Sequence, residues 1–262
     1  MTLFCKTQGK GTDIVLLHGW GMHSGIWQSL PQQLAQQMMQ QHRVTTIDMP
    51  GHGNSPITDF NSLEKLAEII APHIPASAIL IGWSLGGMAA MQLALTLPEK
   101  VSRLILITST ARFTNTENQP DDWPHAMAPE VLQQFAKMLE QDPQATLRRF
   151  LSLQLRGCEN ERELLRQLLQ LLNQCDAPKI NALRDGLNIL ENDDLRTEIK
   201  NIQCPVRLIY GQHDRIVPAV VGEAMTNNIA KSKQHIITGA GHAPFLSHPQ
   251  NFFELLNHYL YD

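Results

Sequence analysis

The sequence lacks paired cysteines. Its four cysteines, Cys5, Cys158, Cys175 and Cys204, lie far apart and form neither a Cys-x-x-Cys pair nor a spacing typical of zinc ligands. This distribution argues against a disulfide-stabilised fold and against a cysteine-based metal site. It predicts free thiols in a reducing compartment, and the cytoplasm is the location that we expect.

Long apolar runs and an excess of positive charge are also missing. No apolar stretch approaches the roughly 20 residues that span a bilayer, and residues 1–6 lack the basic start and apolar core of a signal peptide. Lysines and arginines number 21 against 25 acidic residues, which gives a net charge of −4. We therefore expect neither a membrane nor a nucleic acid as a partner, and a monomer is the default expectation.

Short apolar runs recur along the chain instead, with helical patterns between them. They are rich in β-branched residues and bounded by Gly, Pro or Asp, which is typical of strands buried on both faces of a parallel sheet. The predicted strands are Ile14–Leu17, Val44–Ile47, Ala78–Ile81, Leu104–Ile107, Val206–Tyr210 and His235–Ile237, with an antiparallel edge strand at Leu3–Thr7. The alternation predicts an α/β fold with a mostly parallel central sheet flanked by helices.

The alternation stops between residues 112 and 194. This stretch contains no convincing strand and is rich in Leu, Gln, Arg and Glu. Helical patterns cover Val131–Glu140, Ala145–Leu155, Glu161–Asn173 and Ile180–Leu190. We predict a core formed by residues 1–111 and 195–262, and an all-helical cap formed by residues 112–194. The cap is expected over the carboxyl edge of the sheet, where ligands bind in open α/β folds.

A Gly-x-Ser-x-Gly segment follows one of the predicted strands. Ser84 lies at its centre, after Ala78–Ile81 and before a stretch of small residues that favours a helix. A serine at the tip of a strand-turn-helix is the pattern of a nucleophile elbow, in which Gly82 and Gly86 remove side chains that would clash. The pattern predicts an exposed nucleophilic hydroxyl beside N–H groups that can stabilise an oxyanion. An ordinary glycine-rich turn is the alternative.

A serine nucleophile needs a base, and the base needs an acid that orients it. In this architecture the chain order is Ser, then Asp or Glu, then His, with each residue in a loop after a strand. Asp214 follows the strand that ends at Tyr210, and His242 follows the strand that ends near residue 238. We therefore predict a catalytic triad of Ser84, His242 and Asp214. The neighbouring His213 precedes the acid and follows no strand of its own.

The oxyanion hole of such a site needs two backbone donors. One is the N–H of Leu85, the residue after the nucleophile. The second is predicted at Trp20, because His18-Gly19-Trp20-Gly21 follows an early strand and its glycines let the backbone approach a substrate. We expect His18 to brace this loop by hydrogen bonds. The chemistry requires no metal and no organic cofactor.

These motifs together resemble the α/β-hydrolase superfamily with an inserted helical cap, and the resemblance covers essentially the whole chain. A more specific similarity is to the pimeloyl-acyl-carrier-protein methyl ester esterases of biotin synthesis. It rests on the segments Gly82-Trp83-Ser84-Leu85-Gly86-Gly87, His18-Gly19-Trp20-Gly21, Asp122-Trp123-Pro124, Arg149-Phe150-Leu151-Ser152-Leu153-Gln154 and His242-Ala243-Pro244-Phe245. The resemblance implies a serine carboxylesterase that releases methanol from the methyl ester of pimeloyl-acyl-carrier protein.

The resemblance also implies which residues contact the substrate. The implied positions are Trp20, Ser84, Leu85, Phe150, Leu151, Ser152, Leu153, Gln154 and His242. Phe150 and Leu153 equally suit the core of the cap, so a packing role is the alternative for them.

Arginines gather on the predicted cap of this acidic chain. Arg162 and Arg166 are one helical turn apart and share a face. Together with Arg149 they are the expected docking site for an acyl carrier protein, because such carriers are strongly acidic. Glutamates such as Glu163 lie among them, and a solvated face with internal ion pairs is the alternative.

The same triad serves other capped hydrolases, so the pattern leaves rival functions open. They are a general short-chain carboxylesterase, a carbon–carbon bond hydrolase and a lyase of menaquinone synthesis. A non-catalytic ligand-binding protein on the same scaffold belongs to another class. Gln212 and His213 depart from the family pattern, and the sequence leaves their roles open. Acyl chain length, breadth of ester specificity and movement of the cap stay open as well.

Overall fold

The computed structural model describes residues 2–29, 32–115, 123 and 126–261, so Asp122 and Pro124 of the sequence motif lie outside the described residues. Within these ranges, seven strands form one sheet in the order β1-β3-β2-β4-β5-β6-β7. The strands are β1 (Cys5–Gly9), β2 (Thr12–Leu17), β3 (His42–Ile47), β4 (Ala78–Trp83), β5 (Val101–Ile107), β6 (Val206–Gly211) and β7 (Ser232–Ile237). β1 pairs antiparallel with β3, and all other neighbours pair in parallel. The predicted α/β fold is therefore confirmed.

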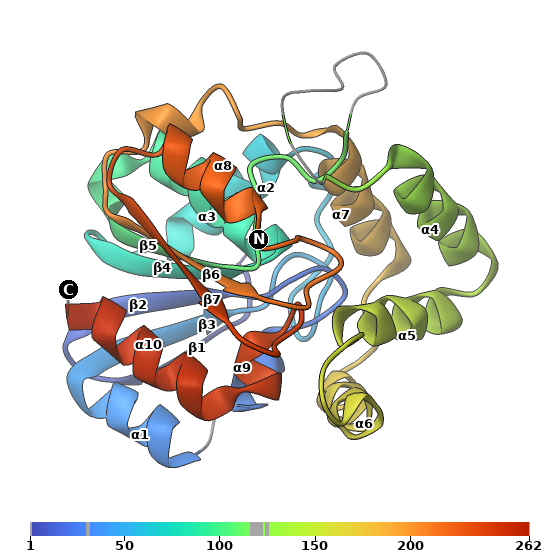
Figure 1. Ribbon diagram of the computed structural model, residues 1–262, viewed down its shortest axis with the longest axis horizontal. Helices are drawn as coiled ribbons and strands as arrows, with labels where there is room; N and C mark the ends of the chain where they lie inside the picture. Colours follow the sequence, from blue (N-terminus) through green and yellow to red (C-terminus); the bar gives the residue numbers. More distant parts are fainter. Residues whose placement is uncertain (1, 30–31, 116–122, 124–125, 262) are drawn as a thin grey trace.

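Helices cover both faces of this sheet (Figure 1). Helices α1 (Gln32–Gln41) and α10 (Pro249–Tyr261) lie on one face, and α2 (Leu63–Ile70), α3 (Leu85–Thr96) and α8 (Val221–Asn228) lie on the other. The remaining helices are α4 (Pro129–Gln141), α5 (Pro143–Gln154), α6 (Glu161–Leu172), α7 (Ile180–Asn192) and α9 (Pro244–Ser247), with 3-10 turns at Ser24–Ser29, Ala71–His73, Pro98–Lys100 and Ile199–Asn201.

The burial of each strand follows from its place in the sheet. Every residue of the central strand β4 is buried, which matches its unbroken apolar sequence. The edge strands are polar and mostly exposed, as in β1 and β7. The antiparallel edge strand predicted at Leu3–Thr7 is present, but it begins two residues later, at Cys5.

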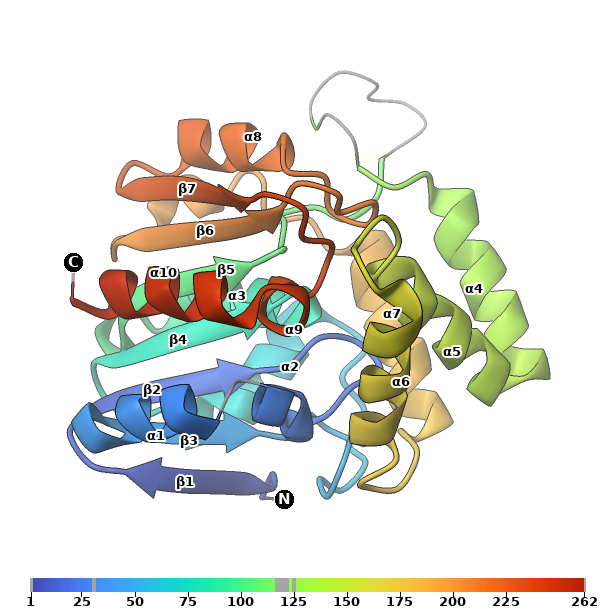
Figure 2. The ribbon, with the colours of Figure 1, turned by 60° about the horizontal axis from the view of Figure 1, so that its bottom comes forward.

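Helices α4 to α7 lie between β5 and β6 in the chain and beyond the carboxyl ends of the parallel strands (Figure 2). They form because each has one apolar face: in α6, Leu164, Leu168 and Leu172 recur every four residues and are buried, while the residues between them are half-buried or exposed. We call α4 to α7 the cap helices.

The two chain segments that lead into and out of the cap helices are fastened together. Arg112 and Asp194 form an isolated antiparallel bridge, and the Arg112 guanidinium contacts the Asp194 carboxylate at 2.7 Å. The N–H of Leu195 donates to the carbonyl of Ala111 at 2.9 Å. The bridge joins the two positions between which the sequence analysis places the cap, and that division of the chain stays a prediction.

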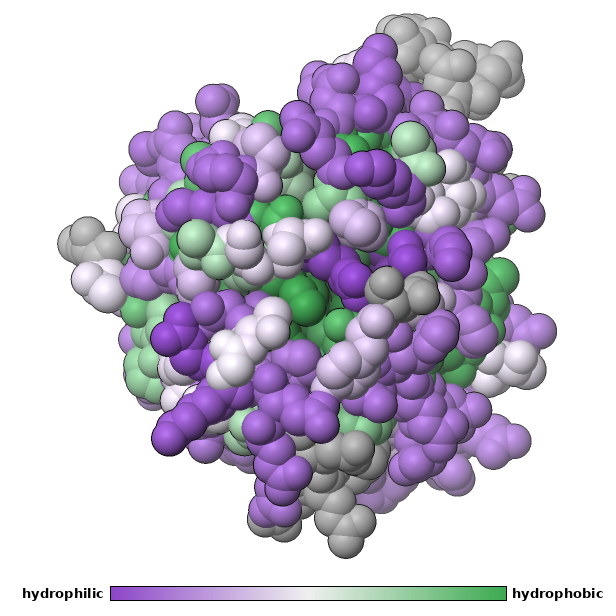
Figure 3. All heavy atoms as spheres, turned by 90° about the vertical axis from the view of Figure 1, so that its left-hand side faces the viewer, coloured by the Kyte–Doolittle hydropathy of each residue, from purple (hydrophilic) through white to green (hydrophobic). Residues whose placement is uncertain are grey.

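Hydrophilic residues dominate the surface drawn in Figure 3, and hydrophobic residues show in small areas between them. The large apolar side chains that are most exposed among the described residues are scattered: Phe4, Ile57, Val131, Val220, Ile236 and Tyr261. No helix in the described ranges combines the length and the apolar character that crossing a membrane requires.

Candidate active site

Ser84 lies at the sharp turn between β4 and α3, in a backbone conformation that few non-glycine residues adopt. Its φ is 55° and its ψ is −119°. The flanking glycines make the turn possible, because a Cβ atom on Gly82 would overlap the main chain of Gly86, and one on Gly86 would overlap the carbonyl of His18. The elbow is thus packed directly against the loop that follows β2.

The main chain of Ser84 is held by two hydrogen bonds to the carboxyl end of the neighbouring strand β5. Its N–H donates to the carbonyl of Ile107 at 3.0 Å, and its carbonyl accepts from the Ser109 hydroxyl at 2.8 Å. The carbonyl of Ser109 in turn accepts from the Tyr210 hydroxyl at 2.9 Å. These interactions fix a strained turn that would otherwise relax.

Ser84 as a whole is largely enclosed and exposes 4% of its surface. The exposure of its hydroxyl stays a prediction. The cap helices pack against the residues beside it: the Phe150 ring of α5 contacts the Trp20 ring edge-on, with centroids 4.7 Å apart, and the Trp20 indole N–H donates to the carbonyl of Leu183 in α7 at 2.9 Å. The cap helices therefore pack directly against the loop that contains Trp20.

Asp214 and His242 form a buried pair in the loops after β6 and β7. Nδ1 of His242 lies 2.8 Å from Oδ2 of Asp214, and both side chains are fully buried. The second carboxylate oxygen, Oδ1, accepts from the N–H groups of Ile216 at 2.8 Å and Val217 at 3.1 Å. With Oδ1 occupied by these amide donors, Oδ2 accepts from the ring, so the Nδ1–H of His242 is the donor in this contact.

Nε2 of His242 is therefore the ring nitrogen that can accept a proton. It is buried, and it has no hydrogen-bond partner among the described residues. The carbonyl of His242 accepts from the Trp83 indole at 2.8 Å and from the Thr108 hydroxyl at 2.8 Å. Because Trp83 directly precedes Ser84, this contact ties the base loop to the elbow.

The two backbone donors expected for an oxyanion come from adjoining segments. Leu85 is the first residue of α3, where no carbonyl of the helix can accept its N–H. Trp20 lies in the loop after β2, and a Cβ atom on the preceding Gly19 would touch the Trp83 ring at 3.0 Å. Both donors thus belong to chain segments that touch the elbow.

His18 braces this loop, as its position suggested. Its Nδ1 donates to the carbonyl of Gly19 at 2.9 Å, and its Nε2 accepts from the N–H of Met49 at 2.9 Å. Burial, and after it the nearby His52, lowers the pKa of His18 to about 3. The His18 ring therefore stays neutral, and its two hydrogen bonds join the loop after β2 to the loop after β3.

The five residues Phe150 to Gln154 divide between two faces of α5. Phe150, Leu151 and Gln154 are buried, and the carbonyl of Gln154 accepts from the N–H of His242 at 2.9 Å. Ser152 is exposed and Leu153 is half-buried, and both line a hollow on the outer side of the cap. The inner face of this stretch lies beside Trp20 and His242. The substrate contacts that the resemblance implies for these five residues stay predictions.

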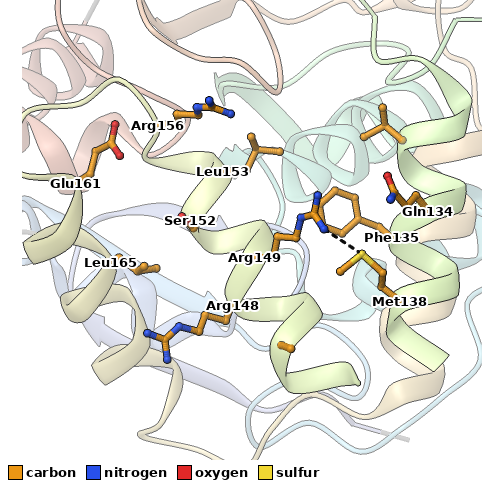
Figure 4. Close-up of a pocket in the computed structure, with 12 residues that line it drawn as sticks. Gln134, Phe135, Met138, Arg148, Arg149, Ser152, Leu153, Arg156, Glu161 and Leu165 are labelled. Atoms are coloured by element: carbon orange, nitrogen blue, oxygen red, sulfur yellow. Dashed lines mark hydrogen bonds between the residues drawn. The ribbon is translucent and has the colours of Figure 1, made fainter. Parts of the chain in front are cut away.

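This outer hollow has a volume of about 770 Å³ and lies between α4, α5 and α6 (Figure 4). Neither Ser84 nor His242 lines it. Its lining combines the apolar side chains Val131, Phe135, Met138, Ala145, Leu153 and Leu165 with Gln134, Arg148, Arg149, Ser152, Arg156 and Glu161. The Arg149 guanidinium lies over the Phe135 ring, 6.0 Å from its centroid, and its Nη1 contacts the Met138 sulfur at 3.5 Å. The hollow is basic at its rim and apolar inside.

Arg162 and Arg166 are both exposed on α6. Arg166 pairs with Glu163 at 2.7 Å, which is the internal pairing that the sequence allowed. The side chain of Arg166 is 66% exposed in that pair. A surface pair of this kind is weak, so it leaves the guanidinium available to a partner.

Sequence reasoning missed the residues that hold the three loops in place. Thr108, Ser109 and Tyr210 contact the main chain of the candidate triad residues or of one another. In the sequence, these residues are marked by their position at the carboxyl ends of β5 and β6. Their contacts could not be predicted, because a side chain that bonds to main chain follows no sequence pattern. Within the described ranges, no group of three or more His, Cys, Asp or Glu side chains is placed to hold a metal ion.

Comparison with known proteins gives matches over nearly the whole chain. The sequence model of the family described as alpha/beta hydrolase fold matches residues 13–249. A pimeloyl-[acyl-carrier protein] methyl ester esterase of Aeromonas salmonicida is 40% identical, over 99% of this chain and 100% of its own length. An esterase with the same name from Nitrosomonas europaea is 38% identical, over 96% of both chains.

Solved structures show the same architecture at lower identity. An esterase from Exiguobacterium antarcticum superposes with a TM-score of 0.87 at 24% identity, covering 99% of this chain and 96% of its own. An enol-lactonase from Burkholderia xenovorans gives a TM-score of 0.84 at 19% identity, covering 99% of this chain and 96% of its own. Because their identity is so low, these structures bear on the fold alone.

Proposed function

Since the chain belongs to the α/β-hydrolase family, and within it to the pimeloyl-[acyl-carrier protein] methyl ester esterases, we propose that it hydrolyses the methyl ester of pimeloyl-acyl-carrier protein in biotin synthesis. The products are pimeloyl-acyl-carrier protein and methanol. The observation that carries the proposal is the 38–40% identity to esterases of that name over nearly the whole length of both chains.

The proposed chemistry is acyl transfer through Ser84. His242 Nε2 takes the proton of the Ser84 hydroxyl as its oxygen attacks the ester carbonyl, and Asp214 stabilises the imidazolium that forms. The N–H groups of Leu85 and Trp20 bind the tetrahedral oxyanion. The intermediate collapses, and the methoxide leaves as methanol with the proton of His242.

Water completes the cycle. His242 Nε2 accepts a proton from the water as its oxygen attacks the acyl-enzyme. When the tetrahedral intermediate collapses, His242 returns this proton to Oγ of Ser84, and the pimeloyl carboxyl group is released. The buried Asp214–His242 hydrogen bond of 2.8 Å supports this assignment, as does the buried Nε2 of His242, which has no hydrogen-bond partner among the described residues. The proposed substrate wall is Trp20 with the α5 stretch from Phe150 to Gln154.

The first experiment is removal of the nucleophile. Ser84→Ala should lower kcat on pimeloyl-acyl-carrier-protein methyl ester by at least about 10³-fold, because the acyl-enzyme cannot form. Demethylation is followed by the loss of mass from the carrier protein. Ser102→Ala, at an exposed serine of β5, is the matched control and should leave the rate unchanged. Turnover near wild type in purified Ser84→Ala would refute the triad.

The rival functions give different results in the same assay. A general carboxylesterase would hydrolyse short p-nitrophenyl esters and leave the carrier-bound ester intact. A ligand-binding protein would turn over neither. A fluorophosphonate labels Ser84 if its hydroxyl is activated. Labelling is therefore expected for each of the hydrolase functions and does not distinguish between them.

We further propose that the acidic carrier docks on the cap through Arg149, Arg162 and Arg166. All three are exposed, and Arg149 borders the outer hollow with its apolar floor. Opposite charge speeds and orients such an encounter. A cytoplasmic location and a monomeric state are proposed from the sequence alone.

A further inference from the structure

The loops that carry Asp214 and His242 remain hydrogen-bonded to each other beyond the ends of their strands. The N–H of Gln212 donates to the carbonyl of Ile237 at 3.1 Å, and the N–H of His213 donates to the carbonyl of Ala240 at 2.8 Å. The Gln212 side chain adds a third link, because its Oε1 accepts from the N–H of Gly239 at 3.0 Å. The acid loop and the base loop therefore form one unit.

The end of α5 and the turn after it touch both of these loops. The carbonyl of Gln154 accepts from the N–H of His242 at 2.9 Å. Three residues later, the carbonyl of Gly157 lies 2.7 Å from Nδ1 of His213. The fit is close, because a Cβ atom on Gly241 would lie 2.7 Å from the Gln154 carbonyl and 2.8 Å from the Cys158 sulfur. We call residues 154–158 the cap turn.

The side chain of His213 joins the acid loop to the cap turn. A carbonyl can only accept, so Nδ1 of His213 is the donor in this contact. Gly157 lies against the side chain of His213, since a Cβ atom on Gly157 would be 3.3 Å from the Cβ of His213 and 3.7 Å from its ring atom Cγ. His213 directly precedes Asp214, whose own N–H donates back to the carbonyl of Gly211 at 3.2 Å. Fixing His213 therefore fixes the backbone from which the acid extends.

We propose that His213 is a positioning residue: through its Nδ1–H bond to Gly157 it holds the acid loop against the same cap turn that holds the base, and so sets the Asp214–His242 geometry. The inference rests on the triad of the proposed function. His213 itself is exposed. Losing one hydrogen bond of an exposed side chain has little effect on global stability, whereas a small misplacement of catalytic groups has a large effect on rate.

The test compares His213→Leu with His213→Asn. Leucine cannot donate, whereas the amide nitrogen of asparagine is the same number of bonds from the backbone as Nδ1 and can donate to Gly157. We expect His213→Leu to lower kcat about tenfold on a short p-nitrophenyl ester, with KM within about twofold of wild type. His213→Asn should recover most of the lost kcat. The Tm of both variants should stay close to that of wild type.

Three controls separate the possible outcomes. His235→Leu makes the same change at an exposed histidine of β7 and should leave kcat unchanged. His213→Ala replaces the leucine variant if that protein does not fold. Ser84→Ala in the same assay tests the triad itself: activity there overturns the proposed function, whereas its loss leaves the His213 result interpretable.

The positioning role is refuted if His213→Leu keeps the wild-type kcat, or if the defect lies only in KM. A loss of kcat that asparagine fails to recover also overturns it, because the donor to Gly157 is then not what matters.

Discussion

Two neighbouring residues of the site have positive φ although neither is glycine. Ser84 has φ 55° and Thr108 has φ 43°. They follow β4 and β5, which are adjacent in the sheet. Such conformations cost on the order of 1–3 kcal/mol each, and they persist here because Ser109, Ile107 and the His242 carbonyl bond to them. The strain is local to the elbow and to the residue that contacts the base loop.

Replacing Ser84 by glycine should release this strain. Glycine adopts a positive φ without a steric penalty. The free energy gained by removing the strain exceeds the entropic cost that glycine adds by making the unfolded chain more flexible. We expect Ser84→Gly to raise Tm by about 2–4 °C relative to Ser84→Ala, which keeps a Cβ atom in the strained position. Both variants lack the hydroxyl, so calorimetry on the pair isolates the backbone effect. An alanine variant that is as stable as the glycine variant would show that the turn is not strained.

Helix α6 separates a packing face from a charged face. Leu164, Leu168 and Leu172 are buried, whereas Arg162 and Arg166 are exposed one turn apart. Because the arginines do not pack in the cap, changing them should leave the fold intact. Their substitution should therefore affect activity only on a substrate that is bound to a charged partner.

Replacing Arg162 and Arg166 together by alanine should raise KM for the carrier-bound ester about tenfold or more, with kcat on a short p-nitrophenyl ester unchanged. The increase should shrink in high salt, where charge attraction is screened. Arg43→Ala is the control. Arg43 is also exposed and forms an ion pair, with Asp13, but it lies near the amino ends of β2 and β3, away from the cap helices. Equal KM values for wild type and double variant would argue against docking on α6.

The limits of most elements were predictable from the sequence within about two residues, and the exceptions have physical causes. The helix predicted at Glu161–Asn173 is α6, Glu161–Leu172. Strand β7 begins at Ser232 rather than at His235, because its first residues are polar and lie at the sheet edge, where no apolar pattern marks them. The positions of Asp214 and His242 after strands were predictable, whereas the contacts of Thr108 and His213 depend on tertiary structure.

At the scale of the whole molecule, a buried polar cluster joins the loops after β2 and β3. His18 and His52 are fully buried, with ring centroids 5.3 Å apart. The Asp48 carboxylate accepts from the N–H of Ser24 at 2.7 Å and from that of Asn54 at 2.8 Å. Burial lowers the pKa of His18 to about 3 and that of His52 to about 4. Both rings are thus neutral in the folded protein at pH 5.

The free energy of unfolding should therefore fall as the pH falls from 6.5 to about 4. In the unfolded chain these histidines titrate near pH 6.5, so unfolding takes up protons in this window. Each ring contributes up to about 1.4 kcal/mol per pH unit. Denaturant unfolding at pH 7, 6 and 5 measures the slope.

The matched variant is His52→Asn, which retains a donor for the Pro50 carbonyl and removes one titrating ring. Its stability should depend less steeply on pH than that of wild type. Equal slopes for the two proteins would show that His52 does not titrate on unfolding.

The cap turn holds the loops of Asp214 and His242, the proposed acid and base, by its main chain. The acceptor for the His242 N–H is the carbonyl of Gln154, and the acceptor for His213 is the carbonyl of Gly157. Every amino acid supplies a carbonyl, so a substitution at position 154 keeps the acceptor for the His242 N–H, whereas the positive φ of 91° at position 157 favours glycine and would strain any other residue. Substitutions of the exposed side chains of α5 therefore leave unchanged the main-chain acceptors that hold these two loops, so the outer surface of the cap helices can vary independently of the Asp214–His242 pair.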